Sequence, residues 1–313
     1  MAPWNIAHRG GAQLRPENTL SAFADAVWRG CDGAELDVQL TADGEVVVYH
    51  DWRLKPEHCR DIHGFWIKEP TPRIKDLTLN ELRQFDVGSA RPGSAYASNH
   101  PNVHWQDEES VPLLSEVIAV AKTARHTFRL IVELKTSFAN RDESADPEVL
   151  AEKTIAVLRE QHYLDRTVFV GFDWAALIAA KKLAPETECW FTTMPQSWFE
   201  PSTPPPESDP PSEPALQMLR YWAREGVSPW AAGFDAIKYN GSILKAIKAA
   251  GGDGWDPMWV DITPKNLSAA RELGLKLATW TVNDPAEMVR LAGCGLDAIY
   301  TDRPDLLMAT LVG

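Results

Sequence analysis

Residues 4–51 read WNIAHRGGAQLRPENTLSAFADAVWRGCDGAELDVQLTADGEVVVYHD, and this stretch decides the fold. Its apolar runs predict buried strands at residues 4–9, 33–38 and 46–50. A helix from Thr19 to Trp28 is expected between the first two strands. Polar side chains stand at the end of each apolar run. This pattern is typical of buried strands that deliver functional groups to one rim of a sheet or barrel.

A tight turn joins the second and third of these strands. Thr41, Asp43 and Gly44 are turn-forming residues, and a turn this short normally connects antiparallel strands. We therefore predict a hairpin over residues 33–50 that projects from the barrel and brings His50 close to the acids of the preceding strand.

Glu35 and Asp37 are two residues apart on one predicted strand, so their side chains point to the same face. Neighbouring carboxylates repel each other, and a divalent cation with oxygen ligands removes that cost. Glu133, at the end of the next predicted barrel strand, is the natural third ligand. The alternative is a salt-bridged surface pair. Three carboxylates in one mouth favour a single bound cation, Mg²⁺ or Ca²⁺.

His8, Arg9 and His50 lie at the ends of the neighbouring strands. Two histidines form a natural acid–base pair near neutral pH, and the planar guanidinium of Arg9 suits a phosphate group. Each histidine taken alone could be a core residue with a backbone partner. Their placement beside a carboxylate-bound cation instead predicts phosphoryl transfer.

The motifs of this stretch resemble those of the glycerophosphodiester phosphodiesterase family. The matching early segments are His8-Arg9-Gly10, Pro16-Glu17-Asn18-Thr19, Glu35-x-Asp37-Val38, Asp43-Gly44 and His50-Asp51. The matching later segments are Val132-Glu133-Leu134-Lys135, Trp280-Thr281-Val282-Asn283 and Thr301-Asp302-Arg303-Pro304. The resemblance therefore extends from residue 6 to residue 304, nearly the whole chain.

The resemblance implies a metal-dependent enzyme that hydrolyses a glycerophosphodiester to glycerol 3-phosphate and an alcohol. The residues expected to serve are His8 and His50 in catalysis; Arg9, Glu17, Lys135 and Trp280 in substrate binding; and Glu35, Asp37 and Glu133 in metal binding. Which histidine is the acid stays open, and the nucleophile is either water or the neighbouring glycerol hydroxyl. Two rival interpretations are a phospholipase D-like enzyme acting on lysophospholipids and a non-catalytic glycerophosphodiester-binding protein.

Several of these residues also have simpler interpretations. Asp51 either orients His50 or caps the following turn. Lys135 neutralises the site or contacts phosphate, or it only pairs with the nearby Glu133. Asn18 or Thr19 can cap the helix. Glu17 is expected to hold Arg9 or a metal-bound water while Asn18, the preferred of the two, does the capping. Trp280 either packs in the barrel or forms a wall for the alcohol portion of the substrate.

The alternation of strands and helices that resumes at residue 113 predicts a parallel sheet with outer helices. Polar residues recur just after the strands, and a closed barrel gathers such positions at one mouth. The expected fold is α/β, a TIM-like (β/α)8 barrel that forms a single domain over residues 1–313. Strand candidates outnumber the eight that are needed, and residues 232–235 and 258–261 are the doubtful ones.

Two irregular segments interrupt this alternation. Residues 52–112 follow the early catalytic strands and lack periodicity, apart from a short helix expected from Thr78 to Phe85. Long irregular segments beside a catalytic rim are usually functional. We predict that this insertion selects the alcohol group, with Phe65, Trp66 and Trp105 at the rim, and does little to hold the barrel. Residues 201–214 contain seven prolines and predict an extended surface loop.

The composition bounds the possible partners. The 313-residue chain has 44 acidic and 31 basic residues, a formal net charge of −13, which disfavours nucleic acid as a partner. Neither a leader pattern nor an apolar run of membrane-spanning length is found, so no stable membrane anchor is expected. Its four cysteines, at positions 31, 59, 189 and 294, have no metal or redox spacing and favour a reducing cytoplasm. No oligomeric state is predicted.

Overall fold

The computed structural model describes residues 2–196 and 214–312. Within these residues, eight parallel strands form a nearly closed barrel, and one further strand is antiparallel. The strands are β1 (Trp4–Ala7), β2 (Gly33–Leu40), β3 (Val46–Val48), β4 (Arg129–Leu134), β5 (Thr167–Gly171), β6 (Glu188–Thr193), β7 (Gly254–Pro257), β8 (Lys276–Leu277) and β9 (Ala298–Thr301). The predicted TIM-like barrel is confirmed.

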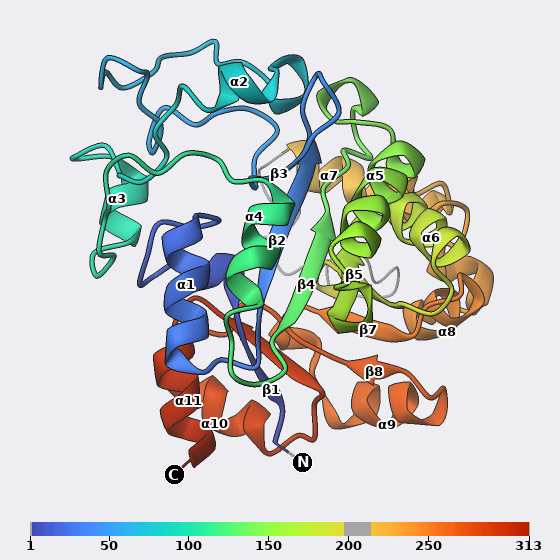
Figure 1. Ribbon diagram of the computed structural model, residues 1–313. Helices are drawn as coiled ribbons and strands as arrows, with labels where there is room; N and C mark the ends of the chain where they lie inside the picture. The colour runs from blue at the N-terminus through green and yellow to red at the C-terminus, as the bar shows by residue number, and fades with distance from the viewer. Residues whose placement is uncertain (1, 197–213, 313) are drawn as a thin grey trace.

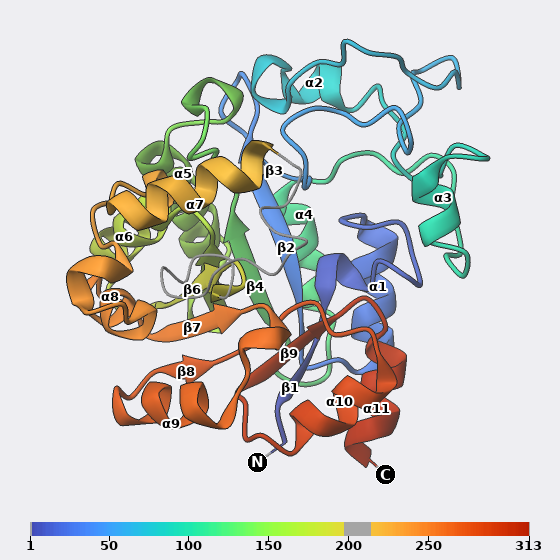
Figure 2. The same ribbon diagram turned by 180° about the vertical axis from the view of Figure 1, so that it is seen from behind.

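Most helices pack around the outside of the barrel (Figures 1 and 2). The helices of the described residues are α1 (Leu20–Arg29), α2 (Leu79–Leu82), α3 (Ala95–Asn99), α4 (Leu114–Ala121), α5 (Pro147–Glu160), α6 (Trp174–Leu183), α7 (Pro214–Glu225), α8 (Ile243–Ala249), α9 (Pro264–Glu272), α10 (Pro285–Ala292) and α11 (Pro304–Val312). Of these, α2 and α3 belong to the insertion at residues 52–112 and not to the outer layer of the barrel. The cap of α1 is Thr19, whose Oγ1 accepts a hydrogen bond from Ala22 N at 3.3 Å. Of the two candidate caps, Asn18 and Thr19, the second is thus confirmed, and the preference for Asn18 was wrong.

The strand order explains how the barrel closes. Neighbouring strands follow β8-β7-β6-β5-β4-β2-β1-β9. The segment that continues β8 then bonds to β9, because Val282 N donates to Tyr300 O and Tyr300 N donates to Thr279 O, each at 2.9 Å. The first and last strands are also neighbours in the sheet. The beginning and the end of the chain therefore meet in one wall of the barrel.

Alternate strand residues face opposite sides of the sheet. Outward side chains such as Leu36, Val132 and Phe169 pack with the helices in the main apolar core. Inward side chains such as Ile6, Val168 and Trp190 form a separate apolar cluster inside the barrel. The barrel is thus filled rather than open, and a ligand has room only at its mouth.

The predicted hairpin is formed by β2 and β3. Val38 pairs with Val48 in antiparallel register, and Tyr49 N donates to Asp37 O at 2.9 Å. His50 follows directly, so the hairpin brings it to the strand that carries Glu35 and Asp37.

The insertion at residues 52–112 stands above the carboxyl ends of β2 and β4 (Figure 1). It shares a small apolar core with the β2–β3 hairpin, which sequence periodicity did not reveal. The buried members are Val47, Tyr49, Leu54, Cys59, Ile74, Leu82, Val87 and Val111. These side chains come mostly from turns and irregular backbone, where apolar residues follow no regular spacing. The helix expected from Thr78 to Phe85 is the shorter α2.

Three other segments differ from expectation or lie outside the described residues. The strand expected at residues 232–235 does not form. The strand expected at residues 258–261 is also absent, since Trp259–Asp261 form a 3-10 turn. The barrel strand of this region is β7, which ends just before it at Pro257. Of the proline-rich segment 201–214, only Pro214 falls within the described residues, at the start of α7. None of the helices in the described ranges is both long and apolar enough to cross a membrane.

Candidate active site

The backbone after β1 turns sharply to present two functional side chains. His8–Gly10 form a 3-10 turn in which Arg9 has a φ of 50° and Gly10 a φ of 83°. A Cβ at Gly10 would lie 2.7 Å from the Cβ of Ala22, so α1 packs against this turn at a distance that only glycine allows. Arg9 N donates to Glu35 Oε2 at 3.0 Å, which fixes the turn against β2.

Glu35 and Asp37 on β2 and Glu133 on β4 form the acidic centre of the mouth. Asp37 and Glu133 are register partners on adjacent strands. One oxygen from each of the three carboxylates lies within 4.8 Å of the others. This spacing and this purely oxygen donor set fit Mg²⁺ or Ca²⁺.

The charges around these acids are unevenly balanced. Burial and the adjacent Asp37 raise the pKa of Glu35 to about 8. Burial acts in the same direction on Asp37, but His50, Lys135 and Arg9 reverse it and hold its pKa below the ordinary value. Glu35 therefore resists ionisation beside the ionised Asp37. A further positive charge bound between them would favour the ionised form of both carboxyl groups.

Lys135 stands between two of the acids. Its Nζ lies 2.9 Å from Glu133 Oε1 and 3.6 Å from Asp37 Oδ1. The ammonium group is buried, and these carboxylates raise its pKa although burial alone lowers it. Lys135 is therefore a fixed positive charge at the mouth, and its simpler interpretation as a partner of Glu133 holds as well.

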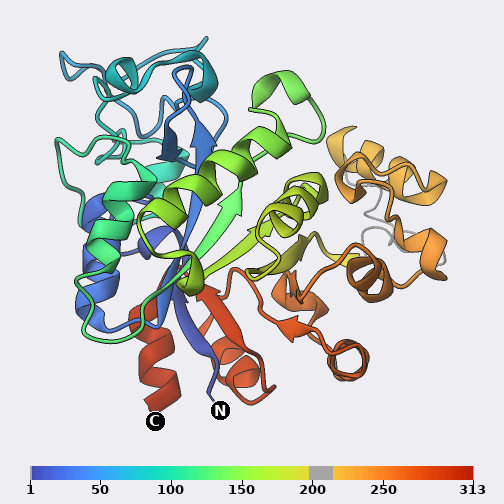
Figure 3. The same ribbon diagram turned by 45° about the vertical axis from the view of Figure 1, so that its right-hand side comes forward.

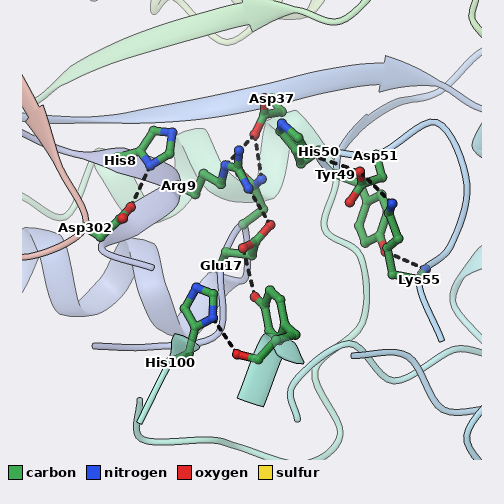
Figure 4. Close-up of polar contacts among 12 residues, drawn as sticks. His8, Arg9, Glu17, Asp37, Tyr49, His50, Asp51, Lys55, His100 and Asp302 are labelled. Atoms are coloured by element: carbon green, nitrogen blue, oxygen red, sulfur yellow. Dashed lines mark hydrogen bonds and ion pairs between the residues drawn. The ribbon is translucent and has the colours of Figure 1, made fainter. Parts of the chain in front are cut away.

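Arg9 is held in place by an acid and a tyrosine. Its Nη1 donates to Glu17 Oε1 at 2.9 Å, and Tyr96 Oη donates to Glu17 Oε2 at 2.8 Å (Figure 4). Arg9 Nε also lies 3.5 Å from Asp37 Oδ2. Tyr96 belongs to α3 in the insertion, so the insertion reaches the barrel mouth through this contact.

The aromatic neighbours of Tyr96 form a stack. Its ring centroid lies 4.6 Å from that of His58 and 4.2 Å from that of His100, and Trp105 lies 6.1 Å away. Trp105 thus joins this stack. Trp66 does not belong to this group, and the guanidinium carbon of Arg60 lies 5.5 Å from the centroid of its ring. Phe65 is largely exposed.

His8 has a carboxylate partner on the last strand of the barrel. Its Nδ1 lies 2.6 Å from Asp302 Oδ1 (Figure 4). Asn283 Nδ2 donates to Asp302 Oδ2 at 2.6 Å. His8 and Asn283 hold the pKa of Asp302 below its usual range against the effect of burial. Since the ionised carboxylate only accepts, His8 Nδ1 carries the proton and Nε2 faces Glu35 at 3.7 Å.

The pKa of His8 reflects this pairing. Burial alone lowers it, but the charge of Asp302 and the hydrogen bond to it raise the pKa to about 8. His8 can therefore exist in either protonation state near neutral pH.

His50 has a looser arrangement at the end of the hairpin. Its Nδ1 lies 3.5 Å from Asp51 Oδ1, and Lys55 Nζ lies 3.3 Å from the same oxygen. Burial raises the pKa of Asp51, but the neighbouring His50 and Lys55 bring it down to about 2. Asp51 is therefore placed to orient His50, one of the two roles left open for it.

Trp280 lies at the mouth beyond β8. Its Nε1 donates to the backbone oxygen of Asp256 at 3.0 Å. Phe172 meets its ring edge to face, with the centroids 5.4 Å apart. These two contacts fix the indole as part of the wall between β5 and β8.

The comparisons with known proteins agree over nearly the whole chain. The sequence model of the glycerophosphoryl diester phosphodiesterase family matches residues 8–306. The chain belongs to this family. It is 27% identical to the glycerophosphodiester phosphodiesterase of Caldanaerobacter subterraneus subsp. tengcongensis, over 97% of this chain and 95% of that protein. The family resemblance noted from the motifs is thus confirmed, and the chain is an enzyme of the glycerophosphodiester phosphodiesterase class.

Solved structures support the same fold. A structure from Silicibacter pomeroyi DSS-3 that carries the family name is 30% identical and covers 98% of this chain and 92% of its own, with a TM-score of 0.79. A phosphodiesterase from Oleispira antarctica, in complex with the product sn-glycerol 3-phosphate, is 22% identical and covers 100% and 98% of the two chains, with a TM-score of 0.68. At that identity the second likeness supports the barrel fold alone.

The structure brings all nine residues that we expected in this phosphodiesterase site to the barrel mouth, and it adds others. Asp302 and Asn283 lie in the later family motifs, where their sequence position had suggested no role. Asn18 donates from Nδ2 to Asp37 Oδ2 at 2.8 Å instead of capping α1. Tyr96 lies in the irregular insertion, which offers no periodic signal to mark it.

Proposed function

We propose that this enzyme hydrolyses glycerophosphodiesters to glycerol 3-phosphate and an alcohol, by acid–base catalysis between His8 and His50 at a carboxylate-bound cation. The observation that carries the proposal is the grouping of both histidines, Arg9 and three acids at one barrel mouth. The similarity over nearly the whole chain to a protein named glycerophosphodiester phosphodiesterase supports this choice of reaction.

Each residue has a proposed part in the reaction. The oxygen of the nucleophile, water or the neighbouring glycerol hydroxyl, bonds to phosphorus while the P–O bond to the alcohol breaks. Attack by water gives glycerol 3-phosphate directly, whereas attack by the glycerol hydroxyl gives a cyclic phosphate that water then opens. One histidine takes the proton of the nucleophile, and the other gives a proton to the departing alcohol oxygen. Arg9, held by Glu17, binds the phosphate oxygens, Lys135 adds positive charge, and Trp280 lines the alcohol side.

Glu35, Asp37 and Glu133 would hold one Mg²⁺ or Ca²⁺, which when bound supplies charge stabilisation at the phosphate oxygens. The raised pKa of Glu35 supports this assignment, because a cation relieves the repulsion between Glu35 and Asp37. A small-molecule substrate and a cytoplasmic location complete the proposal. All four cysteines are free thiols, as a reducing compartment requires.

The test of this function is a panel of diesters. Glycerophosphocholine, glycerophosphoethanolamine and a bis-alkyl phosphate without glycerol are incubated with the enzyme and Mg²⁺ or Ca²⁺. Release of glycerol 3-phosphate and alcohol from the glycerol-bearing diesters alone supports the proposal. Binding of the same diesters without any product would instead favour the binding-protein alternative.

The partner of His8 gives a prediction about pH. In Asp302→Asn the pKa of His8 should fall, because the charge and the acceptor that raise it are lost. The limb of the pH–rate profile that belongs to His8 should therefore move to lower pH, and kcat should fall by about 10–100-fold. A shifted alkaline limb identifies His8 as the acid, and a shifted acidic limb identifies it as the base.

Asp305→Asn is the control. Asp305 lies three residues after Asp302 in the sequence and pairs with Arg303. It should leave both limbs in place. An unchanged profile in Asp302→Asn would show that Asp302 does not act on His8 in the working enzyme.

The contact of the insertion with Glu17 gives a second prediction. Tyr96→Phe removes one hydrogen bond to the acid that holds Arg9, so KM should rise roughly 3–10-fold with little change in melting temperature. Ile62→Ala, at an exposed position of the same insertion, should change neither. If Tyr96→Phe lowered stability and left KM unchanged, the insertion would serve the fold rather than substrate binding.

A further inference from the structure

His58 is a buried histidine in the first part of the insertion. Figure 3 shows the insertion, coloured from sky blue to teal, beside the β2–β3 hairpin and above α1. The residue is only 5% exposed. Within residues 2–196 and 214–312, no protein group forms a hydrogen bond with its ring nitrogens. A buried polar ring without such a bond needs another physical reason for its position.

The imidazole of His58 stacks with two tyrosines. Its ring centroid lies 5.9 Å from that of Tyr49 and 4.6 Å from that of Tyr96, and the ring planes are inclined by 29° and 25°. Aromatic rings at such distances attract each other. Tyr49 lies at the end of the hairpin and directly precedes His50, whereas Tyr96 on α3 donates to Glu17 at 2.8 Å. His58 therefore joins the segment that carries His50 to the helix that holds Glu17.

Four charged side chains act on the imidazole. Burial lowers the pKa of His58; the negative charges of Glu17 and Asp51 oppose this effect without reversing it, and the positive charges of Lys55 and Arg9 add to it. The two tyrosines contribute no charge, because burial raises the pKa of both hydroxyl groups. The pKa of His58 thus lies below its ordinary value of 6.5, and the ring is uncharged at neutral pH.

The two carboxylates beside His58 each serve a residue of the site. Glu17 Oε1 accepts from Arg9 Nη1 at 2.9 Å, and Asp51 Oδ1 lies 3.5 Å from His50 Nδ1. An uncharged His58 leaves both carboxylates to these partners. A protonated His58 would attract both carboxylates and repel Arg9, so it would weaken the two pairs at once.

We propose that His58 is a positioning residue that couples two arms of the site. The phosphate arm is Arg9 with Glu17, and the acid–base arm is His50 with Asp51. The stacked ring fixes the two arms relative to each other, and its uncharged form keeps both carboxylates with their partners. Protonation of this one ring disables both arms together. The inference rests on the proposed function and adds a residue to its machinery.

Two replacements of His58 test the role of the stacked ring. His58→Leu removes the ring, so at mildly alkaline pH the KM of glycerophosphocholine should rise roughly 3–10-fold and kcat should fall roughly tenfold. His58→Phe keeps a ring against both tyrosines and should restore both constants. A failure of His58→Phe to restore either constant would overturn the proposal. So would a lower melting temperature in His58→Leu with KM and kcat unchanged, because the ring would then only stabilise the insertion.

The pH dependence tests the charge of the ring. As pH falls through the pKa of His58, below 6.5, KM should rise and kcat should fall together in the unmodified enzyme. Glycerophosphocholine has no group that titrates in this range. In His58→Phe the KM should stay level, because a benzyl ring accepts no proton. A rise of KM at acid pH that persists unchanged in His58→Phe would overturn the proposal.

His100→Phe is the matched control for this exchange. His100 stacks on the other partner of Tyr96, with the centroids 4.2 Å apart, and its Nδ1 lies 2.8 Å from Tyr96 O. The variant should keep the acid transition of KM whatever its absolute value, because Glu17 and Asp51 both lie within reach of the charge of His58. Loss of the transition in His100→Phe would assign it to the stack as a whole and overturn the role of His58.

A double variant tests whether His58 acts through Glu17. Tyr96→Phe removes the hydrogen bond from the insertion to Glu17. If His58 acts on KM through that bond, Tyr96→Phe should raise KM by less than about twofold in the His58→Leu background. A rise equal to that in the unmodified enzyme would show two independent routes and would overturn the coupling.

Nuclear magnetic resonance separates this inference from the proposed function. The carboxyl carbons of Glu17 and Asp51 and the ring of His58 are followed against pH, whether or not any diester is hydrolysed. Both carboxyl signals should move at the pH at which the His58 ring takes up its proton, and this movement should vanish in His58→Phe. Carboxyl signals that do not follow the ring, or that move unchanged in His58→Phe, would overturn the coupling and leave the proposed function untouched.

Discussion

Replacing either His8 or His50 by alanine should reduce the hydrolysis rate of an unactivated glycerophosphodiester by on the order of 10²–10⁴. His8 ends β1 and His50 ends the β2–β3 hairpin, so the two rings approach the acidic centre from different elements. Displacement at phosphorus needs a base beside the nucleophile and an acid beside the departing oxygen. The measurement is single-turnover kinetics with glycerophosphocholine.

A good leaving group should distinguish the two roles. A nitrophenyl ester needs little help from an acid, so it should restore the rate of the variant that lacks the acid and not that of the other. The double variant should lose less than the product of the single losses, because the two residues act as a unit. His63→Ala, in the exposed part of the insertion, is the control. Near-normal hydrolysis of glycerophosphocholine by either single variant would refute the mechanism.

Removal of the cation should abolish turnover, and Mg²⁺ or Ca²⁺ should restore it. Glu35→Gln should weaken metal binding by at least about tenfold in calorimetry, since it removes one charged ligand of three. Glu188→Gln is a matched control at the opposite end of the barrel, where Glu188 accepts from Trp190 Nε1. Full activity of the stripped protein in EDTA would end the metal assignment.

The same acids predict how metal-free stability depends on pH. Burial and the adjacent Asp37 raise the pKa of Glu35 from its ordinary value of 4.5 to about 8. The folded state therefore holds more protons than the unfolded state and loses stability as pH rises between these values. His8 acts in the same direction, since the stability from its raised pKa is lost as pH rises through about 8. The bound cation should therefore raise the melting temperature more at pH 8 than at pH 5. A larger shift at pH 5 would contradict this account.

The barrel and the centre of its site were predictable because they depend on short-range patterns. The two-residue spacing of Glu35 and Asp37 fixes their common face whatever surrounds them, and the Thr41–Gly44 turn fixes the hairpin that positions His50. The failures have equally local causes. β7 contains Gly254 and Pro257, which weaken any strand signal, while residues 232–235 link two 3-10 turns, Pro229–Ala231 and Ala236–Tyr239.

The partners of the site residues were beyond reach because they depend on tertiary structure. Asp302 meets His8 across 294 positions of sequence, and only the closure of the barrel brings them together. Tyr96 meets Glu17 across 79 positions, from a segment with no periodicity. Asn18 was misassigned because a polar residue before a helix is usually its cap, whereas here its amide binds Asp37.

The neighbouring position of β1 and β9 has a consequence for synthesis on the ribosome. The ribosome adds Asp302 294 residues after His8, and one wall of the barrel stays open until β9 is in place. A nascent chain thus carries most of the proposed catalytic side chains through the synthesis of the intervening strands without a finished site. We expect full activity only after β9 has been made and has paired with β1.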